Sequence, residues 1–372
     1  MKVALVRAKY SPFGGAERVL NSAVESLVTL GATPTIITRS WPDSAGASVA
    51  HQLINPRYMT SAGRDRGFAR ALCTALAAHD FDLVQSYERL PCCDVFHAVE
   101  GVHAEWLFQR RRIQSAVQRF GVAINPHHRY VLDAERRMFE SPRLRAVICV
   151  SQMVKREIAA RFNVPEDRLS VIYGGIDCEH FHPGLRDLHR QSTRAQLGIP
   201  QGAPVAVCVG SGFARKGVAA YLDTLARIDG LYGIVVGHDK HIDRYRQRAA
   251  QLGLEKRVTF TGGIKDVRPY YGASDIFLMP TVYEPFGLTF GEAMACGLPV
   301  VASTKAGAAD WITEGVSGFV ADPADVSALV SAVNQTLTRP EMGIAGRAAV
   351  MPYTPARITA DYAAFYRGLL PR

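Results

Sequence analysis

The chain has 372 residues, about twice the length of an ordinary domain, which predicts two domains. Its 48% hydrophobic and 21% charged residues are typical of a globular protein and exclude a wholly disordered chain. The 43 basic residues outnumber the 34 acidic ones, and the net charge of +9 favours an anionic partner without identifying it.

Hydropathy and cysteine usage indicate where the protein is located. No run of 18 apolar residues is present, so a membrane-spanning helix is not expected. Arg7 and Lys9 follow only four apolar residues, which is too short for a secretory signal and predicts a cytosolic protein. The seven cysteines are an odd number without C-x-x-C spacing. They predict buried reduced thiols, including the adjacent pair Cys92 and Cys93, and neither a zinc site nor a disulfide framework.

Short apolar strands alternate with helical segments along the chain, in two successive series. The first series has expected strands at Lys2–Arg7, Thr35–Thr38, Leu83–Gln85 and Ala146–Val150. The second has them at Val205–Val209, Gly233–Val236, Val258–Phe260, Ile276–Met279 and Val300–Ala302. Strands this short and apolar suit parallel sheets covered by helices on both faces. The sequence therefore predicts an α/β protein with two doubly wound, Rossmann-like domains.

A region rich in Gly, Pro and His, Tyr173–Pro200, separates the two series, and we place the hinge near Tyr173–Gly184. The first domain is expected to span residues 1–175 and the second residues 176–354. The last segment, residues 355–372, is predicted to be a helix that packs back on the first domain.

Two glycine-containing loops follow expected strands. Gly14 and Gly15 let backbone N–H groups approach an anion at a helix N-terminus, although a plain tight turn would also need them. In the segment 210–217, Gly212 precedes Arg215 and Lys216, two cations that would suit a diphosphate. A solvated helix start is the alternative. Arg215 occupies the third glycine position of a dinucleotide fingerprint, and the P-loop pattern is absent.

The segment 280–300 carries two carboxylates eight residues apart, Glu284 and Glu292. Pro285 and Gly287 keep Glu284 in a loop, whereas Glu292 lies on the helix that follows. The loop–helix junction directs the N–H groups of residues 286–288 at one spot, where they can hold sugar hydroxyls or phosphate.

Together, these three segments resemble the motifs of the family-four retaining glycosyltransferases, whose GT-B fold has two Rossmann-like domains facing across a cleft. The resemblance covers nearly the whole chain and is strongest to the enzymes that glucosylate heptose in the lipopolysaccharide core. It implies that Arg215 and Lys216 bind the donor diphosphate, that Glu292 binds the ribose, and that Glu284 holds the donor sugar. It also implies further donor contacts from Gly14, Gly15, Gly212, Ile264, Phe286, Gly287, Leu288 and Thr289.

The same resemblance points to two residues of the first domain. His103 stands where many relatives carry a histidine that contacts the transferred sugar, and Glu17 is an acceptor-side candidate. The resemblance further implies leaving-group catalysis without a metal or other cofactor. The only D-x-D pattern, Asp80 to Asp82, is interpreted as a turn that leads into a strand.

Positive charge is concentrated between Trp106 and Arg145, where nine arginines and three acidic residues give +6. Apolar and aromatic residues interleave with these cations, a composition that suits the surface of an anionic membrane. A solvated arginine-rich helix is the alternative, and no nucleic-acid motif is present. The expected membrane-facing residues are Trp106, Arg110, Arg111, Arg112 and Arg119.

The resemblance thus implies a retaining hexosyltransferase, which we expect to be peripheral on the inner face of the cytoplasmic membrane. Its donor would be a nucleotide-diphosphate sugar, with a UDP-glucose-like donor favoured and the choice between UDP and GDP left open. Its acceptor would be a lipid-linked glycan such as lipopolysaccharide core. A soluble acceptor, a non-catalytic nucleotide-sugar-binding protein and a dinucleotide-dependent oxidoreductase are the alternatives. The oligomeric state is not predicted.

Overall fold

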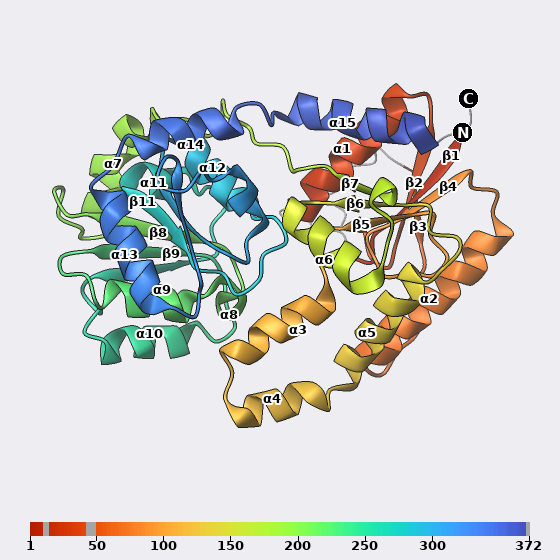
Figure 1. Ribbon diagram of the computed structural model, residues 1–372, viewed down its shortest axis with the longest axis horizontal. Coiled ribbons are helices and arrows are strands. Elements are labelled where there is room, and N and C mark those ends of the chain that lie inside the picture. The colour runs from red at the N-terminus through yellow and green to blue at the C-terminus, as the bar shows by residue number, and fades with distance from the viewer. Residues whose placement is uncertain (10–14, 42–49, 370–372) are drawn as a thin grey trace. The chain divides into compact units, whose positions relative to one another are not determined.

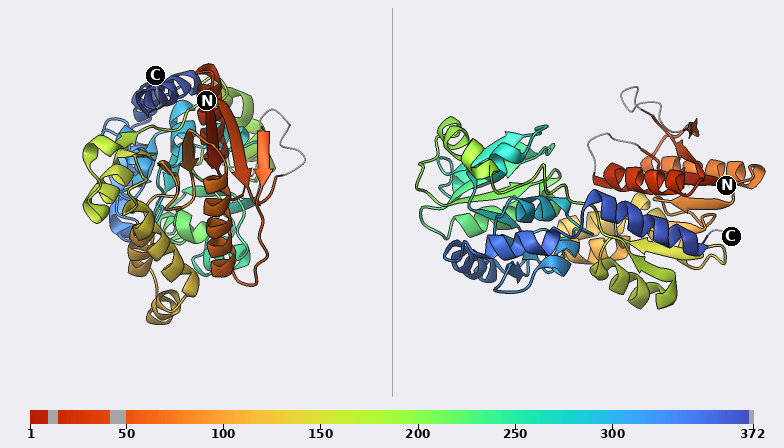
Figure 2. Two further views of the ribbon diagram at one scale, coloured as in Figure 1. Left: turned by 90° about the vertical axis from the view of Figure 1, so that its right-hand side faces the viewer. Right: turned by 90° about the horizontal axis from the view of Figure 1, so that it is seen from above.

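A computed structural model describes residues 1–9, 15–41 and 50–369 (Figure 1). The chain divides into two compact units. One comprises Met1–Gly175 and Pro355–Arg372, and the other comprises Ile176–Thr354. Helix α15 (Pro355–Leu369) belongs to the first unit, where it lies beside α1 (Gly15–Thr29) (Figure 2). The Ser26 hydroxyl on α1 donates to the Thr359 carbonyl oxygen at 2.7 Å and ties the two helices together.

The described part of the first unit has a parallel seven-stranded sheet in the order β3-β2-β1-β4-β5-β6-β7. The strands are β1 (Lys2–Val6), β2 (Thr33–Thr38), β3 (Ala50–Leu53), β4 (Leu83–Ser86), β5 (Val95–Ala98), β6 (Ala146–Cys149) and β7 (Leu169–Val171). The remaining helices are α2 (Ser61–Ala78), α3 (His103–Arg112), α4 (Ala116–Ala123), α5 (Pro126–Phe139), α6 (Gln152–Phe162) and the 3₁₀ turn η2 (Glu166–Arg168).

The second unit has a parallel sheet in the order β10-β9-β8-β11-β12-β13. Its strands are β8 (Val205–Val209), β9 (Tyr232–Val236), β10 (Val258–Gly262), β11 (Ile276–Met279), β12 (Val300–Ser303) and β13 (Gly318–Ala321). Its helices are α7 (Leu185–Gln196), α8 (Phe213–Lys216), α9 (Val218–Leu225), α10 (Ile242–Gln251), α11 (Arg268–Ala273), α12 (Leu288–Ala295), η3 (Gly307–Trp311), α13 (Val326–Leu337) and α14 (Met342–Val350).

Both sheets are built as the short apolar strands predict, because their central strands are buried on both faces by helices. The expected fold class is therefore confirmed. Four strands that the sequence did not indicate, β3, β5, β7 and β13, are only three or four residues long. None of the helices in the described part of the chain is long and apolar enough to span a membrane.

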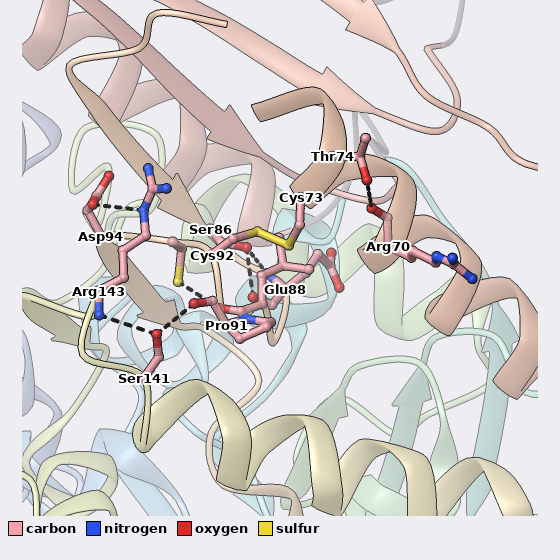
Figure 3. The surroundings of a disulfide bond; sticks show 12 residues. Arg70, Cys73, Thr74, Ser86, Glu88, Pro91, Cys92, Asp94, Ser141 and Arg143 are labelled. Carbon is pink, nitrogen blue, oxygen red and sulfur yellow. Dashed lines mark hydrogen bonds and ion pairs between the residues drawn. A yellow bond between two sulfur atoms is a disulfide. The ribbon is translucent and has the colours of Figure 1, made fainter. Parts of the chain in front are cut away.

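The expectation of reduced thiols throughout is wrong at one pair of cysteines. Cys73 on α2 and Cys92, between β4 and β5, form a disulfide with their Cα atoms 5.8 Å apart (Figure 3). Neither the spacing of the cysteines nor their odd number indicates this bond, because the bond depends on where α2 packs against the loop after β4. The adjacent Cys93 is a free, buried thiol that donates to the Leu90 carbonyl oxygen, and burial raises its pKa to about 12.

Candidate functional site

Three predicted site residues meet at the carboxyl edge of the second sheet. Arg215 and Lys216 end helix α8, directly after β8, while Glu284 follows β11, the neighbour of β8. The strand order reverses between these two strands, which is where open α/β sheets bind ligands. One carboxylate oxygen of Glu284 accepts from Lys216 Nζ at 2.6 Å and from Arg215 Nη1 at 2.7 Å.

The cluster of Arg215, Lys216 and Glu284 is charged although it is largely buried. Burial by itself raises the pKa of Glu284, but the charges of Arg215 and Lys216 outweigh burial and lower the pKa below its ordinary value. Lys216 is only 7% exposed, whereas the Arg215 side chain remains 39% exposed. The two cations share one carboxylate, so the cluster has a surplus positive charge beside an exposed guanidinium.

Close backbone approaches position the two cations. Gly217, with φ +71°, has no room for a Cβ because the Pro280 carbonyl oxygen lies against it. The Arg215 carbonyl oxygen in turn accepts from Thr281 Oγ1 and from the Val282 amide, both at 2.8 Å. The loops after β8 and β11 are therefore joined by backbone contacts, which hold the Arg215 and Lys216 side chains beside Glu284.

Helix α12 begins where the loop after β11 ends. Its N-cap is Gly287 in the left-handed region, with φ +93°, where a side chain would be strained. The first amides of the helix, at Leu288 and Thr289, have no intrahelical carbonyl partner. Thr289 Oγ1 is also buried without a hydrogen bond, and the Phe286 ring packs edge-on against Trp311 at 4.8 Å between centroids. The geometry suits the predicted role of this junction in holding hydroxyl or phosphate oxygens.

The other predicted donor contacts lie around the same edge. Glu292 on α12 is 4% exposed and accepts from the Tyr271 hydroxyl at 3.1 Å. Gly212 is the left-handed N-cap of α8, and Ile264 follows β10 and is half-buried. A residue that the motifs did not indicate, Asp239, accepts from the Phe213 amide at 2.7 Å at the start of α8.

His103 begins helix α3 in the first unit. Its amide donates to Glu135 Oε1 at 3.0 Å, and its Nε2 lies 3.2 Å from His128 Nδ1. Burial, followed by the Arg89 charge, lowers the pKa of His103 to about 3, so its ring is neutral at physiological pH. Glu17 on α1 is 4% exposed, with Oε1 4.0 Å from Arg7 Nε. His103 and Glu17 line the same pocket, of about 610 Å³.

The predicted membrane-facing residues fall on α3 and α4 with unequal exposure. Trp106 and Arg110 are half-buried, with the Arg110 guanidinium 5.8 Å from the Trp106 ring, while Arg111, Arg112 and Arg119 are exposed. Helix α4 has no buried residue. Exposed large apolar side chains accompany these cations at Phe108, Ile113, Val117, Phe120 and Ile124.

Gly14 lies outside the described residues, and Gly15 is the first residue of α1. Asp82 of the D-x-D pattern accepts from the Lys2 amide at 2.7 Å where the chain enters β4. Within residues 1–9, 15–41 and 50–369, no group of three or more His, Cys, Asp or Glu side chains could hold a metal ion.

Two family descriptions match successive parts of the chain. Residues 13–180 match Glycosyltransferase Family 4, and residues 189–345 match Glycosyl transferases group 1. Together they span most of both units and leave no support for a dinucleotide-dependent oxidoreductase. The chain is 25% identical over 355 residues to the lipopolysaccharide glucosyltransferase WaaG of Escherichia coli strain K12, covering 93% of this chain and 92% of the relative.

A second curated relative and two solved structures are also similar to this chain. The lipopolysaccharide core biosynthesis glycosyltransferase LpsE of Rhizobium meliloti is 33% identical over 142 residues, covering 38% of this chain and 42% of LpsE. The crystal structure of WaaG matches with a TM-score of 0.82 at 23% identity, over 98% of this chain and all of that one. Anabaena HepE in complex with UDP-glucose matches with a TM-score of 0.70 at 20% identity, over 99% of this chain and 100% of HepE. At these identities the two structures show the GT-B fold alone.

Proposed function

This chain belongs to the glycosyltransferases of family 4 with a group 1 glycosyl transferase domain, and on that premise we propose its reaction. It transfers a hexose from a nucleotide-diphosphate sugar, with UDP-glucose favoured, to a lipid-linked glycan such as lipopolysaccharide core, with retention at the anomeric carbon. The names of the relatives WaaG and LpsE support the acceptor class. The single observation that carries the reaction is the convergence of Arg215 and Lys216 at the switch point of the second sheet.

The chemistry follows from where charge develops. The bond between the anomeric carbon and the diphosphate oxygen breaks, and its electron pair stays on the diphosphate. An acceptor hydroxyl forms the new bond, and its proton passes to the departing diphosphate. Arg215, Lys216 and the first amides of α12 stabilise the departing diphosphate, because fixed donors in a partly buried site need no reorganisation. Glu292, already held by the Tyr271 hydroxyl, binds the ribose hydroxyls.

Arg215, Lys216 and the first amides of α12 supply the positive charge that a divalent cation supplies in other sites that bind phosphate groups. We therefore propose that neither a metal nor another cofactor is required. Full activity after extensive treatment with EDTA is the expected result. Activity that disappears on chelation and returns with manganese would contradict it.

The acceptor's lipid anchor places the enzyme at the inner face of the cytoplasmic membrane. Helix α4 supports this location, because Val117 and Phe120 are 83% and 67% exposed beside the exposed cations of α3 and α4. Such a surface binds anionic lipid through both apolar area and charge. Flotation with anionic vesicles should recover the protein, and vesicles of neutral lipid should not. The double substitution V117D/F120D should abolish flotation, whereas I344D, at an exposed position of the second unit, should not.

A panel of UDP- and GDP-hexoses tests the reaction itself. We expect one of them to raise the melting temperature of the protein by ligand linkage and to be slowly hydrolysed without acceptor. Binding without hydrolysis or transfer would favour the non-catalytic alternative. Transfer to a small glycoside as fast as to a lipid-linked glycan would favour the soluble acceptor.

A further inference from the structure

The first unit contains a pocket of about 610 Å³ that His103 and Glu17 line and whose charged arginines have no role in the reaction described above. It lies at the carboxyl edge of the first sheet, where residues after β1, β2, β4 and β5 meet. The strand order reverses between β1 and β4, so the pocket occupies the switch point of this sheet. Its charged lining residues are Arg7, Lys9, Glu17, Arg39, Arg64, Asp65, Glu88, Arg89 and Glu100.

Three of the pocket's arginines are held by carboxylates. Arg7 Nη1 lies 3.5 Å from Glu88 Oε1, and Arg64 donates to both oxygens of its neighbour Asp65, at 2.7 and 3.3 Å. Arg89 Nε donates to Glu135 Oε1 at 3.0 Å. These three guanidinium groups are therefore neutralised within the protein.

Arg39 is positioned differently. It directly follows β2, and its amide donates to the Ala8 carbonyl oxygen at 3.2 Å. Its guanidinium carbon lies 5.9 Å from the Tyr58 ring centre and 6.0 Å from that of Phe68 on α2. Across the residues that the structure describes, no carboxylate lies within 4.0 Å of it, and its buried Nε has no hydrogen bond. Aromatic rings thus orient this cation without using its donors.

The pairing of the charges in the pocket also leaves room for an anion. Lys9, like Arg39, has no ion pair with any described residue, so two of the five cations of the lining are unpaired. Burial, followed by the neighbouring Glu100 carboxylate, raises the pKa of Glu88 above its ordinary value. A planar guanidinium with free donors is the side chain best suited to bind a phosphate or carboxylate through two parallel hydrogen bonds.

We propose that Arg39 binds an anionic group, a phosphate or a carboxylate, of the acceptor sugar in this pocket, which the acceptor-side candidate Glu17 also lines. The proposal rests on the proposed glycosyltransferase reaction and narrows its acceptor to a glycan that bears negative charge close to the receiving residue. Arg39 is then a specificity-determining residue that distinguishes a charged sugar from its neutral counterpart.

The test titrates the full-length protein with glucose 6-phosphate, glucuronate and glucose in the presence of saturating UDP, which fills any diphosphate site. We expect at least one anionic sugar to bind more than tenfold more tightly than glucose, and its identity to distinguish phosphate from carboxylate. R39Q should weaken that binding about ten- to hundredfold, as expected for hydrogen bonds to a charged group. R70Q removes the same charge from an exposed position on α2 and should change nothing.

R39K provides the second variant, because it keeps the charge near the rings and removes the planar fork. It should bind the anionic sugar more weakly than the wild type, and thermal unfolding establishes that each variant is folded. Equal affinities of R39Q, R39K and R70Q, or glucose binding as tightly as its charged counterparts, would overturn the proposal. Failure of UDP to bind would instead contradict the proposed donor reaction, while the comparison of R39Q with R70Q would still decide the role of the pocket.

Discussion

Replacing Lys216 by alanine is the most direct test of the diphosphate site. The Lys216 ammonium is almost fully buried, 2.6 Å from Glu284, and its side chain packs on Gly210. The substitution removes one of the two cations that would face the departing diphosphate. Arg215 remains 2.7 Å from Glu284, so the carboxylate keeps one charged partner.

The expected magnitude differs between turnover and stability. Losing one preorganised donor to a developing anion raises the barrier by about 3–4 kcal/mol, which is a hundredfold to thousandfold in turnover. Breaking a buried ion pair outright costs about 3–5 kcal/mol of folding free energy. Because Arg215 still neutralises Glu284, the loss of stability should be well below that figure. K216A should therefore be folded but nearly inactive.

The assay compares transfer and donor hydrolysis by the wild type, K216A and K256A. Lys256 is exposed in the turn that leads into β10, at the opposite edge of the sheet, and provides a charge-matched control. K256A should retain full turnover. A folded K216A that keeps more than a tenth of the wild-type turnover would refute the role of this cation in the reaction.

Three further changes test other parts of the structure. E292Q should weaken UDP binding about tenfold in calorimetric titration, because a neutral amide accepts more weakly from ribose hydroxyls than a carboxylate does. Unchanged affinity would show that Glu292 does not bind the ribose. Burial lowers the pKa of His97 to about 3 from 6.5, so its stabilising contribution is complete above pH 6.5 and is lost as the pH falls toward 3. Between pH 7 and 5 the wild type should lose about 2 kcal/mol more unfolding free energy than H97N in urea titrations; equal losses would contradict a neutral buried ring. C92S should lower the unfolding free energy by about 3 kcal/mol, as expected for the loss of a disulfide between cysteines 19 residues apart in the sequence. Peptide mapping without reductant should recover Cys73 joined to Cys92. Free thiols at both cysteines would refute the bond.

The alternation of short apolar strands and helices determined the two doubly wound sheets without any tertiary information. The family resemblance assigned Arg215, Lys216 and Glu284 to one donor site, and the structure explains why they lie together: each follows a strand, and the carboxyl ends of parallel strands share one edge. The same reasoning could have found Arg39, which directly follows β2, but no motif accompanies it.

Only the tertiary structure decided which side chains pair across these edges. The bond between Cys73 and Cys92, the contact of His103 with His128, and the rings beside Arg39 all join segments separated by a helix or a long loop. Local patterns report which face of an element is buried, but partner choice depends on how whole elements pack against one another. Among the described residues, that packing leaves Arg39 in the first pocket without a carboxylate partner, and neither composition nor spacing contains that information.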